Sequence, residues 1–504
     1  MFFLSVNLEH TGFILNKIII TIVAVFLPFL QWASEGSDWS ALAKEDLKAS
    51  KELIEKHHPA LVDPLADHVD FKKWLSDGYE GALELADKVS SFEGYRDVLA
   101  FYAAGFRDGH LSVVTQGTHS SWPQFILTYN HGKFLIVSDL PGTDPQKLPP
   151  HGAEVIALNG EDPCVLIERN LFPYMVDDPA LESSWSRLTL PLVLNTGNPF
   201  IEPIKNITYR FEGQEFSYAL KWTNLSQEEV IYYRMLALYG QPLDFSIREF
   251  GDNGVWISLP TFYEPTEGVY EALNAIVAQL PDLRDRHPIV FDLRFNTGGM
   301  STWVVKILTA LYGKEYLGSI SIKNSTSYAD DRPSEGMIHY IESILSGMEA
   351  SGIPVDDETY VICKEYCKNM KKALSNGDIF LSRPIGLSPF ADMKHDRVVS
   401  NPVAGTVYFL TDEYCFSSAL LFADAILSIP NVVHIGATTD ADTIFGQALK
   451  VPLPGKKSEI LIPTMVRRNW KRGNNEPYRP QHVFPKQMRD QKELEEWVLK
   501  LKKS

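Results

Sequence analysis

The sequence predicts an α/β protein in which helices cover a sheet and accessory segments precede and interrupt it. Two observations carry this prediction. Strand-like and helix-like apolar patterns alternate over residues 241–320, and the same alternation returns over residues 404–504. A third observation agrees with them, because 45% of the 504 residues are apolar and a chain of this length can bury several cores.

The segments before the sheet have different patterns. Residues 37–115 show helical apolar spacing, as in "DLKASKELIEKHHPAL", and predict a small helical N-terminal domain. Residues 116–172 contain short strand-like runs separated by turns, such as "KFLIVSDL" and "GAEVIALNG", and predict a compact β-rich module. Residues 173–240 are expected to connect this module to the sheet as a further β-rich segment.

The α/β core is predicted in two parts. In residues 241–320 the strands "GVWISLP" and "PIVFDLR" alternate with the helices "VYEALNAIVAQL" and "TWVVKILTALYG". Residues 321–403 are polar and irregular, with one amphipathic helix around "MIHYIESILSGMEA", and we interpret them as an insertion. The core then resumes in residues 404–504 with the strand "GTVYFLTDEY", the helix "ALLFADAILSI" and the strand "VVHIGATT".

The N-terminus predicts export. An apolar run at Ile18–Leu30 follows Lys17 and precedes small residues, so residues 1–36 have the layout of a secretory signal peptide. Counted from Phe13 to Trp32, the same segment approaches membrane-spanning length, and an uncleaved anchor is the alternative. Three glycosylation sequons in polar surroundings support a secreted or extracytoplasmic protein, at Asn206, Asn224 and Asn324.

Charge and cysteine content exclude several functions. The formal net charge of −17 argues against a nucleic-acid binder, which needs a basic surface to neutralise phosphates. The four cysteines are too few for a disulfide scaffold. Cys363 and Cys367 lack partners for zinc.

The stretch "TDEYCFSSALLFADAI", Thr411–Ile426, places two adjacent serines where a strand gives way to a helix. Serine is a common helix cap, and the cap interpretation is the simpler one. The alternative is acyl chemistry, which requires a nucleophile, a base, a carboxylate and donors for an oxyanion. Ser417 precedes the helix, where its hydroxyl and the Ser418 N–H can face one point.

Three blocks of the chain, "VFDLRFNTGG", "VYFLTDEYCFSSALLFADAI" with "VVHIGATT", and "GAEVIALNGEDP", resemble the carboxyl-terminal processing proteases of peptidase family S41. The resemblance covers roughly Phe101–Val498 and implies a ClpP/crotonase-like catalytic core with a PDZ-like module at 116–172. It implies that Ser417, six residues before Ala423, is the nucleophile. It also implies an oxyanion hole formed by Gly298 and Gly299, to which the helix start adds the N–H of Ser418.

One difference from the family pattern indicates which branch of the family this chain resembles. The lysine-dependent branch has its general base 25 residues after the nucleophile, where this chain has Asp442. The chain is nearer the tricorn-type and chlamydial secreted proteases, and this resemblance implies His110 of "FRDGHLSV" as base and Glu476 of "RGNNEPYRP" as the acid. Asp108 and Asp442 are the rivals of Glu476 for that role.

The implied function is that of a secreted serine endopeptidase acting on peptides or unfolded proteins, with membrane contact only through an uncleaved signal. Its Ser-His-acid mechanism needs no metal or organic cofactor. A catalytically inactive relative that binds peptides or apolar ligands is the main alternative, and a fluorophosphonate probe separates the two. A conventional α/β hydrolase requires G-x-S-x-G, which "CFSSAL" lacks. Cys415 is a further candidate nucleophile, although a cysteine just before a helix is usually packed.

Overall fold

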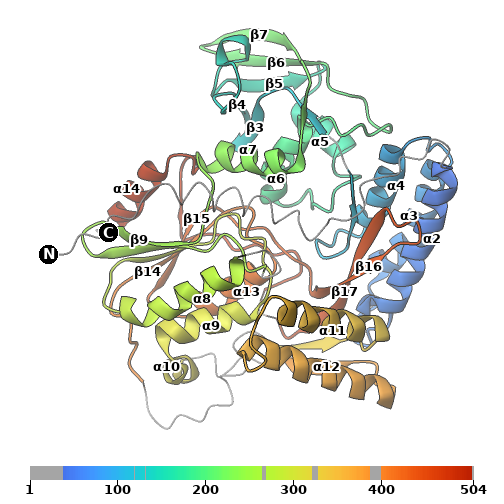
Figure 1. The fold of residues 1–504 in the computed structure, drawn as a ribbon. Helices are drawn as coiled ribbons and strands as arrows, with labels where there is room; N and C mark the ends of the chain where they lie inside the picture. Colours follow the sequence, from blue (N-terminus) through green and yellow to red (C-terminus); the bar gives the residue numbers. More distant parts are fainter. Residues whose placement is uncertain are drawn as a thin grey trace.

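The computed structural model describes residues 38–117, 120–130, 132–263, 268–320, 327–385, 399–470 and 472–501. The predicted signal peptide at 1–36 and the sequon at Asn324 lie outside these residues. Figure 1 shows sheets with helices packed around them, so the predicted α/β class is confirmed. In the described part of the chain, none of the helices has the length and apolarity needed to cross a membrane.

The central sheet has the strand order β18-β15-β14-β11-β10-β9, with β9 antiparallel to β10 and the other pairs parallel. Strands β10, β11 and β14 are buried at every residue, which explains their largely apolar sequences. Helices α8, α9 and α13 cover one face, and α7 and α14 cover the other. The strands are β9 (Ser246–Phe250), β10 (Gly254–Ser258), β11 (Ile289–Asp292), β14 (Val407–Thr411), β15 (Val432–Gly436) and β18 (His482–Val483); the helices are α7 (Gln227–Tyr239), α8 (Val269–Gln279), α9 (Thr302–Tyr312), α10 (Lys314–Ser319), α13 (Ser418–Ile426) and α14 (Gln491–Leu501).

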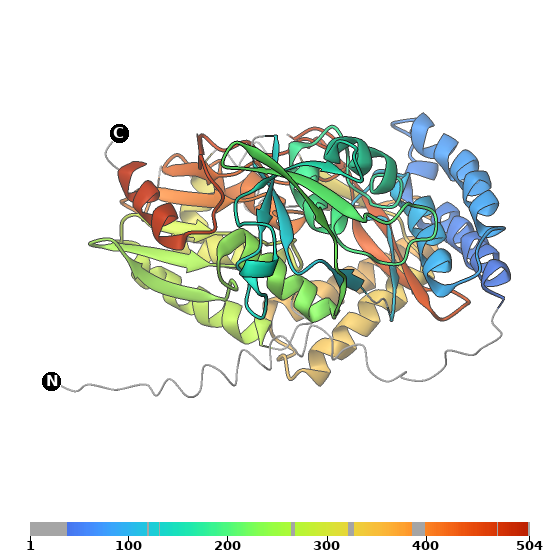
Figure 2. The same cartoon turned by 90° about the horizontal axis from the view of Figure 1, so that it is seen from above.

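A second sheet joins the N-terminal domain to the core. Its longest strand, β17, pairs with β1, β12 and β16, and the N-terminal helices pack on this sheet. The N-terminal helices lie at one end of the molecule and α14 at the other (Figure 2). The strands are β1 (Ser112–Thr115), β12 (Tyr328–Asp331), β13 (Leu381–Pro384), β16 (Phe445–Pro452) and β17 (Ser458–Arg468); the helices are α2 (Trp39–His57), η1 (Pro59–Leu61), α3 (Val69–Ala86) and α4 (Phe92–Ala104).

The prediction that residues 321–403 are irregular apart from one helix is wrong for the described part of this segment. It contains the helical hairpin of α11 (Glu335–Ala350) and α12 (Glu358–Asn376), and β12 and β13 extend the second sheet. Helix α12 buries Tyr360, Cys367, Met370 and Ala373, which recur at helical spacing among charged residues. Asp357 at its N-cap and Gly377 just after its end are the signals that identify it.

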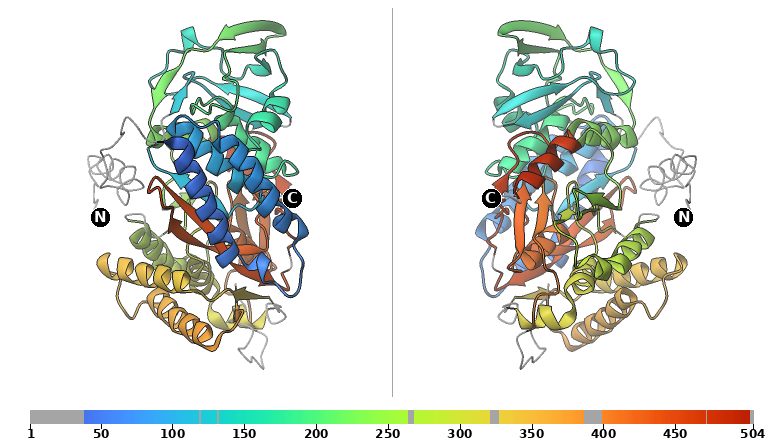
Figure 3. Two further views of the ribbon diagram at one scale, coloured as in Figure 1. Left: turned by 90° about the vertical axis from the view of Figure 1, so that its right-hand side faces the viewer. Right: turned by 90° about the vertical axis from the view of Figure 1, so that its left-hand side faces the viewer.

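The β-rich module forms a five-stranded antiparallel sheet in the order β3-β4-β5-β6-β7. It stands at the opposite side of the molecule from α11 and α12 (Figure 3). The sheet continues beyond residue 172 to Ala219, and α6 and α7 make residues 173–240 less β-rich than predicted. Its elements are β3 (Ile126–Asn130), β4 (Lys133–Val137), η2 (Pro145–Lys147), β5 (Glu154–Leu158), α5 (Pro163–Asn170), α6 (Glu182–Leu192), β6 (Asn206–Phe211) and β7 (Gln214–Ala219), and β2 (Ser120–Trp122) pairs with β8 (Thr223–Leu225) at its base; η3 (Leu280–Leu283) follows α8 in the core.

Candidate active site

Ser417 lies in the turn between β14 and α13. Its backbone angles are φ 54° and ψ −115°, which residues other than glycine rarely adopt. The surrounding turn is fixed by Asp412, whose carboxylate accepts the N–H groups of Phe295 at 2.9 Å and Tyr414 at 3.0 Å. Backbone strain of this kind persists where the surroundings determine it, and it concentrates at functional sites.

Neither serine caps helix α13. Among the described residues, no backbone N–H of the helix donates to the Ser417 side chain. The Ser418 hydroxyl donates instead to the carbonyl oxygen of Gly299 at 2.6 Å. The cap interpretation of these serines is therefore wrong, and the partly exposed Ser417 hydroxyl is available to another partner.

That partner is His110, which lies between α4 and β1, 307 positions away in the sequence. Its Nε2 lies 3.1 Å from Ser417 Oγ. The His110 side chain is 9% exposed, and its ring packs beside Phe416 with centroids 4.8 Å apart. The backbone N–H of His110 donates to Asp108 Oδ1 at 2.9 Å, which fixes the loop that carries the imidazole.

The charges around His110 favour its neutral form. Burial lowers its pKa and the guanidinium groups of Arg467 and Arg472 lower it further, while Asp108 and Asp442 act in the opposite direction. Asp442 stands where the lysine branch has its base, and each guanidinium lies 2.6 Å from its carboxylate. Because the pKa is lowered overall, His110 is neutral at neutral pH and can accept a proton.

The candidate acids lie at different distances from the imidazole. Asp108 Oδ1 lies 3.8 Å from His110 Nδ1. Glu476 is exposed, and its carboxylate accepts the backbone N–H of Gly473 at 2.6 Å. Among the contacts of the described residues, none joins Glu476 to His110. The structure therefore brings Asp108 to the imidazole and does not bring Glu476 there.

The glycine turn after β11 lies against the serines. Gly298 has φ 99°, and a Cβ placed on it would lie 2.8 Å from Ser418 N and 2.9 Å from Ser417 Cβ. The Gly298 N–H donates to Asn296 Oδ1 at 2.9 Å, so it is not free to serve as the oxyanion donor that the family resemblance implies. The lack of a side chain at Gly298 instead leaves room for the two serines. An asparagine two residues before a glycine is the signal of such an Asx turn.

Two backbone donors remain beside Ser417. Within the described part of the chain, the N–H groups of Gly299 and Ser418 donate to no protein acceptor. The first N–H groups of a helix have no partner inside the helix, and they carry the positive end of its dipole. Both N–H groups thus lack a protein acceptor among the described residues, and that of Ser418 lies at the positive end of helix α13, which stabilises negative charge.

Cys415 is not a second nucleophile. Its side chain is buried and Sγ donates to the carbonyl oxygen of Leu293 at 3.0 Å. Burial and the neighbouring Asp412 carboxylate raise the pKa of the thiol well above its usual value. Because the thiolate is the nucleophilic form, this cysteine is inert.

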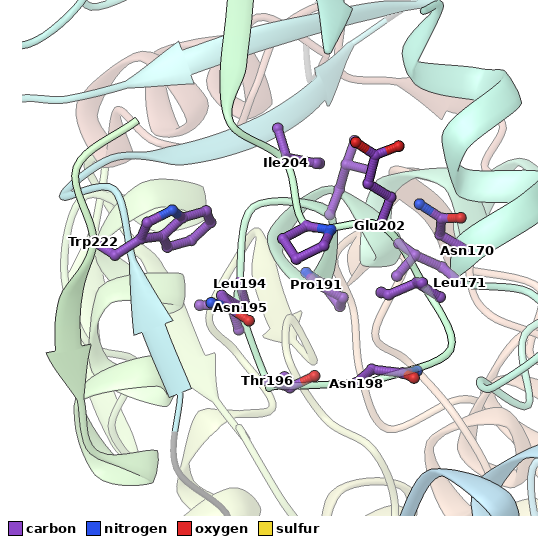
Figure 4. A pocket seen from close by; sticks show the side chains of 13 residues that line it. Asn170, Leu171, Pro191, Leu194, Asn195, Thr196, Asn198, Glu202, Ile204 and Trp222 are labelled. Atoms are coloured by element: carbon purple, nitrogen blue, oxygen red, sulfur yellow. The ribbon is translucent and has the colours of Figure 1, made fainter. Parts of the chain in front are cut away.

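Other predicted sites lie away from these residues. Asn206 and Asn224 are exposed on β6 and β8, and their glycosylation stays a prediction. Among the described residues, no group of three or more His, Cys, Asp or Glu side chains is arranged to hold a metal ion. Figure 4 shows a cavity inside the module, between the ends of α5 and α6 and the chain around Trp222, and neither Ser417 nor His110 lines it.

Comparisons with known proteins bear on the family and the fold of the chain. Residues 255–465 match the family model of peptidase family S41. The crystal structure of mature CPAF superposes with a TM-score of 0.63 at 14% sequence identity, covering 92% of this chain and 97% of that chain. Mature CPAF complexed with lactacystin gives 0.63 at 15% identity, covering 93% and 98%. These likenesses establish a shared fold, and no curated protein matches the sequence.

Proposed function

Because the chain belongs to peptidase family S41 and is a serine-type peptidase, we propose that it hydrolyses internal peptide bonds of protein substrates through Ser417 and His110. The observation that carries the proposal is the 3.1 Å contact between His110 Nε2 and Ser417 Oγ. The strained backbone of Ser417 and the lowered pKa of His110 support it independently.

The proposed reaction follows from this geometry. His110 Nε2 takes the Ser417 proton as Oγ attacks the substrate carbonyl, and the oxyanion forms beside the N–H groups of Gly299 and Ser418. The C–N bond then breaks and His110 returns the proton to the leaving amine. Water hydrolyses the acyl-enzyme by the same steps in reverse order, with His110 as the base.

Asp108 takes the place that the family resemblance gives to Glu476. When Nε2 accepts the Ser417 proton, the ring proton is on Nδ1, and Asp108 Oδ1 is 3.8 Å from that atom. Catalytic hydrogen bonds are often long in a free enzyme and tighten in the substrate complex. A Ser-His-Asp arrangement is thus better supported than Ser-His-Glu, and Asp108→Asn compared with Glu476→Gln separates them.

The proposed substrate is an extended or unfolded polypeptide. Strand β3 is one edge of the module sheet, and α6 packs beside it. A strand edge next to a helix is where a PDZ-like module adds a peptide as a further strand. A secreted location is also part of the proposal, and it rests on the apolar run at 18–30 together with the exposed sequons at Asn206 and Asn224.

Hydrolysis of a reduced, alkylated protein by three purified forms tests the proposal. Wild type is expected to degrade it and Ser417→Ala to be inactive, since loss of the nucleophile costs on the order of 10⁶ in kcat in the template case. Ser418→Ala keeps its backbone N–H and is expected to retain measurable activity. Full activity in Ser417→Ala contradicts the proposal, and an inert wild type identifies an inactive relative.

A further inference from the structure

Three buried polar atoms behind the catalytic pair have no hydrogen-bond partner among the described residues: His58 Nε2, Asp108 Oδ2 and His110 Nδ1. They belong to one continuous row. His58 Nε2 lies 3.7 Å from Asp108 Oδ2, and Asp108 Oδ1 lies 3.8 Å from His110 Nδ1. Buried polar atoms nearly always have a hydrogen-bond partner, so three neighbouring atoms without one call for a functional explanation.

The tautomer of His58 is fixed by its own contacts. Its Nδ1 accepts the backbone N–H of Ala60 at 3.2 Å, so the proton of the neutral ring is on Nε2 and faces Asp108. The ring is fully buried, stacked on Phe71 with centroids 4.1 Å apart and edge-on to Phe445 at 4.6 Å. These two rings hold the imidazole in one orientation.

The backbone of His58 is also anchored. His58 is the C-cap of helix α2, where its N–H donates to the Ile54 carbonyl at 2.9 Å, and its own carbonyl accepts from Arg332 at 2.8 Å. The N-terminal helical domain thereby presents a rigid donor to the far side of the Asp108 carboxylate. His58 carries no functional signal in the sequence, because its relation to Asp108 depends on the packing of α2 against the loop after α4.

We infer that His58 is a positioning residue, whose Nε2–H holds Asp108 Oδ2 so that Oδ1 faces His110 Nδ1 while His110 carries the proton of Ser417. The inference rests on the proposed function of Ser417 and His110. A carboxylate held on one oxygen keeps the other directed at the imidazole, and a charged hydrogen bond of this kind is stronger than a neutral one.

The charges that face this row set its pH response. The facing groups are Asp108, His68 and Arg332 around His58, then His58 and His110 around Asp108, and Asp108, Asp442, Arg467 and Arg472 around His110. Burial lowers the pKa of His58, which therefore stays neutral. Burial opposes the charge of Asp108, but His58 and His110 outweigh it and lower the pKa of that carboxyl.

The test measures the second-order rate constant with which a fluorescent fluorophosphonate labels the full-length protein. In this reaction Ser417 Oγ forms a bond to phosphorus, His110 takes its proton, and the P–F bond breaks to release fluoride. His58→Phe and His58→Asn both remove the donor to Asp108, while the asparagine oxygen can still accept from Ala60. His58→Gln extends an amide N–H toward the Nε2 position, and His57→Phe is the matched control, a buried histidine next in sequence.

We expect about 10- to 100-fold slower labelling in His58→Phe and His58→Asn, which is the effect of losing one hydrogen bond to a charged group. His58→Gln is expected to recover most of the rate and His57→Phe to keep it. Adding His58→Phe to the Asp108→Asn variant should slow labelling little further, because His58 acts through Asp108. Thermal unfolding of each variant identifies any that do not fold.

The pH profile separates positioning from general damage. Asp108→Asn removes a charge that raises the pKa of His110, so the acid limb of the labelling rate should move to lower pH. His58→Asn should move it in the same direction and by less. A folded His58→Asn with wild-type rate and profile, or a fully additive double variant, overturns the inference. Labelling of Ser417→Ala at the wild-type rate overturns the proposed function itself.

Discussion

Gly298→Ala is expected to inactivate the enzyme through contact with the oxyanion donor. The added Cβ would lie 2.8 Å from Ser418 N and 2.9 Å from both Phe416 O and Ser417 Cβ. These neighbours are backbone atoms and a Cβ, so they cannot rotate away. Ordinary contact begins near 3.4 Å, and reaching it requires a shift of about 0.6 Å at the Ser418 N–H.

Such a shift exceeds the tolerance of a catalytic donor. Loss of one oxyanion donor costs about 10²- to 10³-fold in kcat, and alanine at φ 99° adds roughly 1 to 3 kcal/mol of backbone strain. The assay is kcat on a fluorogenic peptide, with the unfolding midpoint measured alongside. Gly347→Ala in α11 is the matched control, since its Cβ would meet no atom within 4 Å. A folded Gly298→Ala with wild-type kcat would refute the reasoning.

Three further predictions concern the same site. Burial, Arg467 and Arg472 lower the pKa of His110, so kcat/KM should fall only below the pH at which an exposed histidine becomes protonated. An acid limb of the pH profile above pH 7 would contradict this. Asp108→Asn should lower kcat by at least about 100-fold, and Glu476→Gln by less than about 3-fold, by analogy with the template triad; the reverse order restores Glu476 as the acid. Trp122 and Thr223 are partners in the β2–β8 pair, so a two-residue Asn-Gly turn can replace residues 123–222. Cleavage of long polypeptides should then fall more than cleavage of short peptides. Equal losses of the two activities would contradict a substrate-binding role for the module.

Elements with a strong local pattern could be predicted from the sequence. The strands and helices of residues 241–320 are buried on continuous apolar faces, and they form where predicted. Strands β12 and β13 could not be predicted, because β12 is held by pairing with the distant strand β17 and β13 by pairing with β12. Their own sequences are short and polar. Non-local pairing leaves no period in the local sequence.

The same distinction applies to the site. Ser417, the glycine turn and His110 are all assigned through the family resemblance, and the structure brings the Ser417 and His110 side chains together. The acid could not be chosen from the sequence, because the positions of both carboxylates depend on the folded backbone. Asp108 lies in a tight loop two residues before His110 and accepts its N–H, whereas Glu476 accepts the N–H of Gly473.

The site of covalent labelling tests the central claim most directly. The wild-type protein is treated with the fluorophosphonate, digested, and mapped by mass spectrometry, beside Ser417→Ala and His110→Ala. We predict a single phosphonylated serine, Ser417, with labelling abolished in Ser417→Ala and slowed by several orders of magnitude in His110→Ala, as expected for loss of a triad base. Labelling at another residue, or wild-type labelling of Ser417 in His110→Ala, would contradict the assignment of this pair as nucleophile and base.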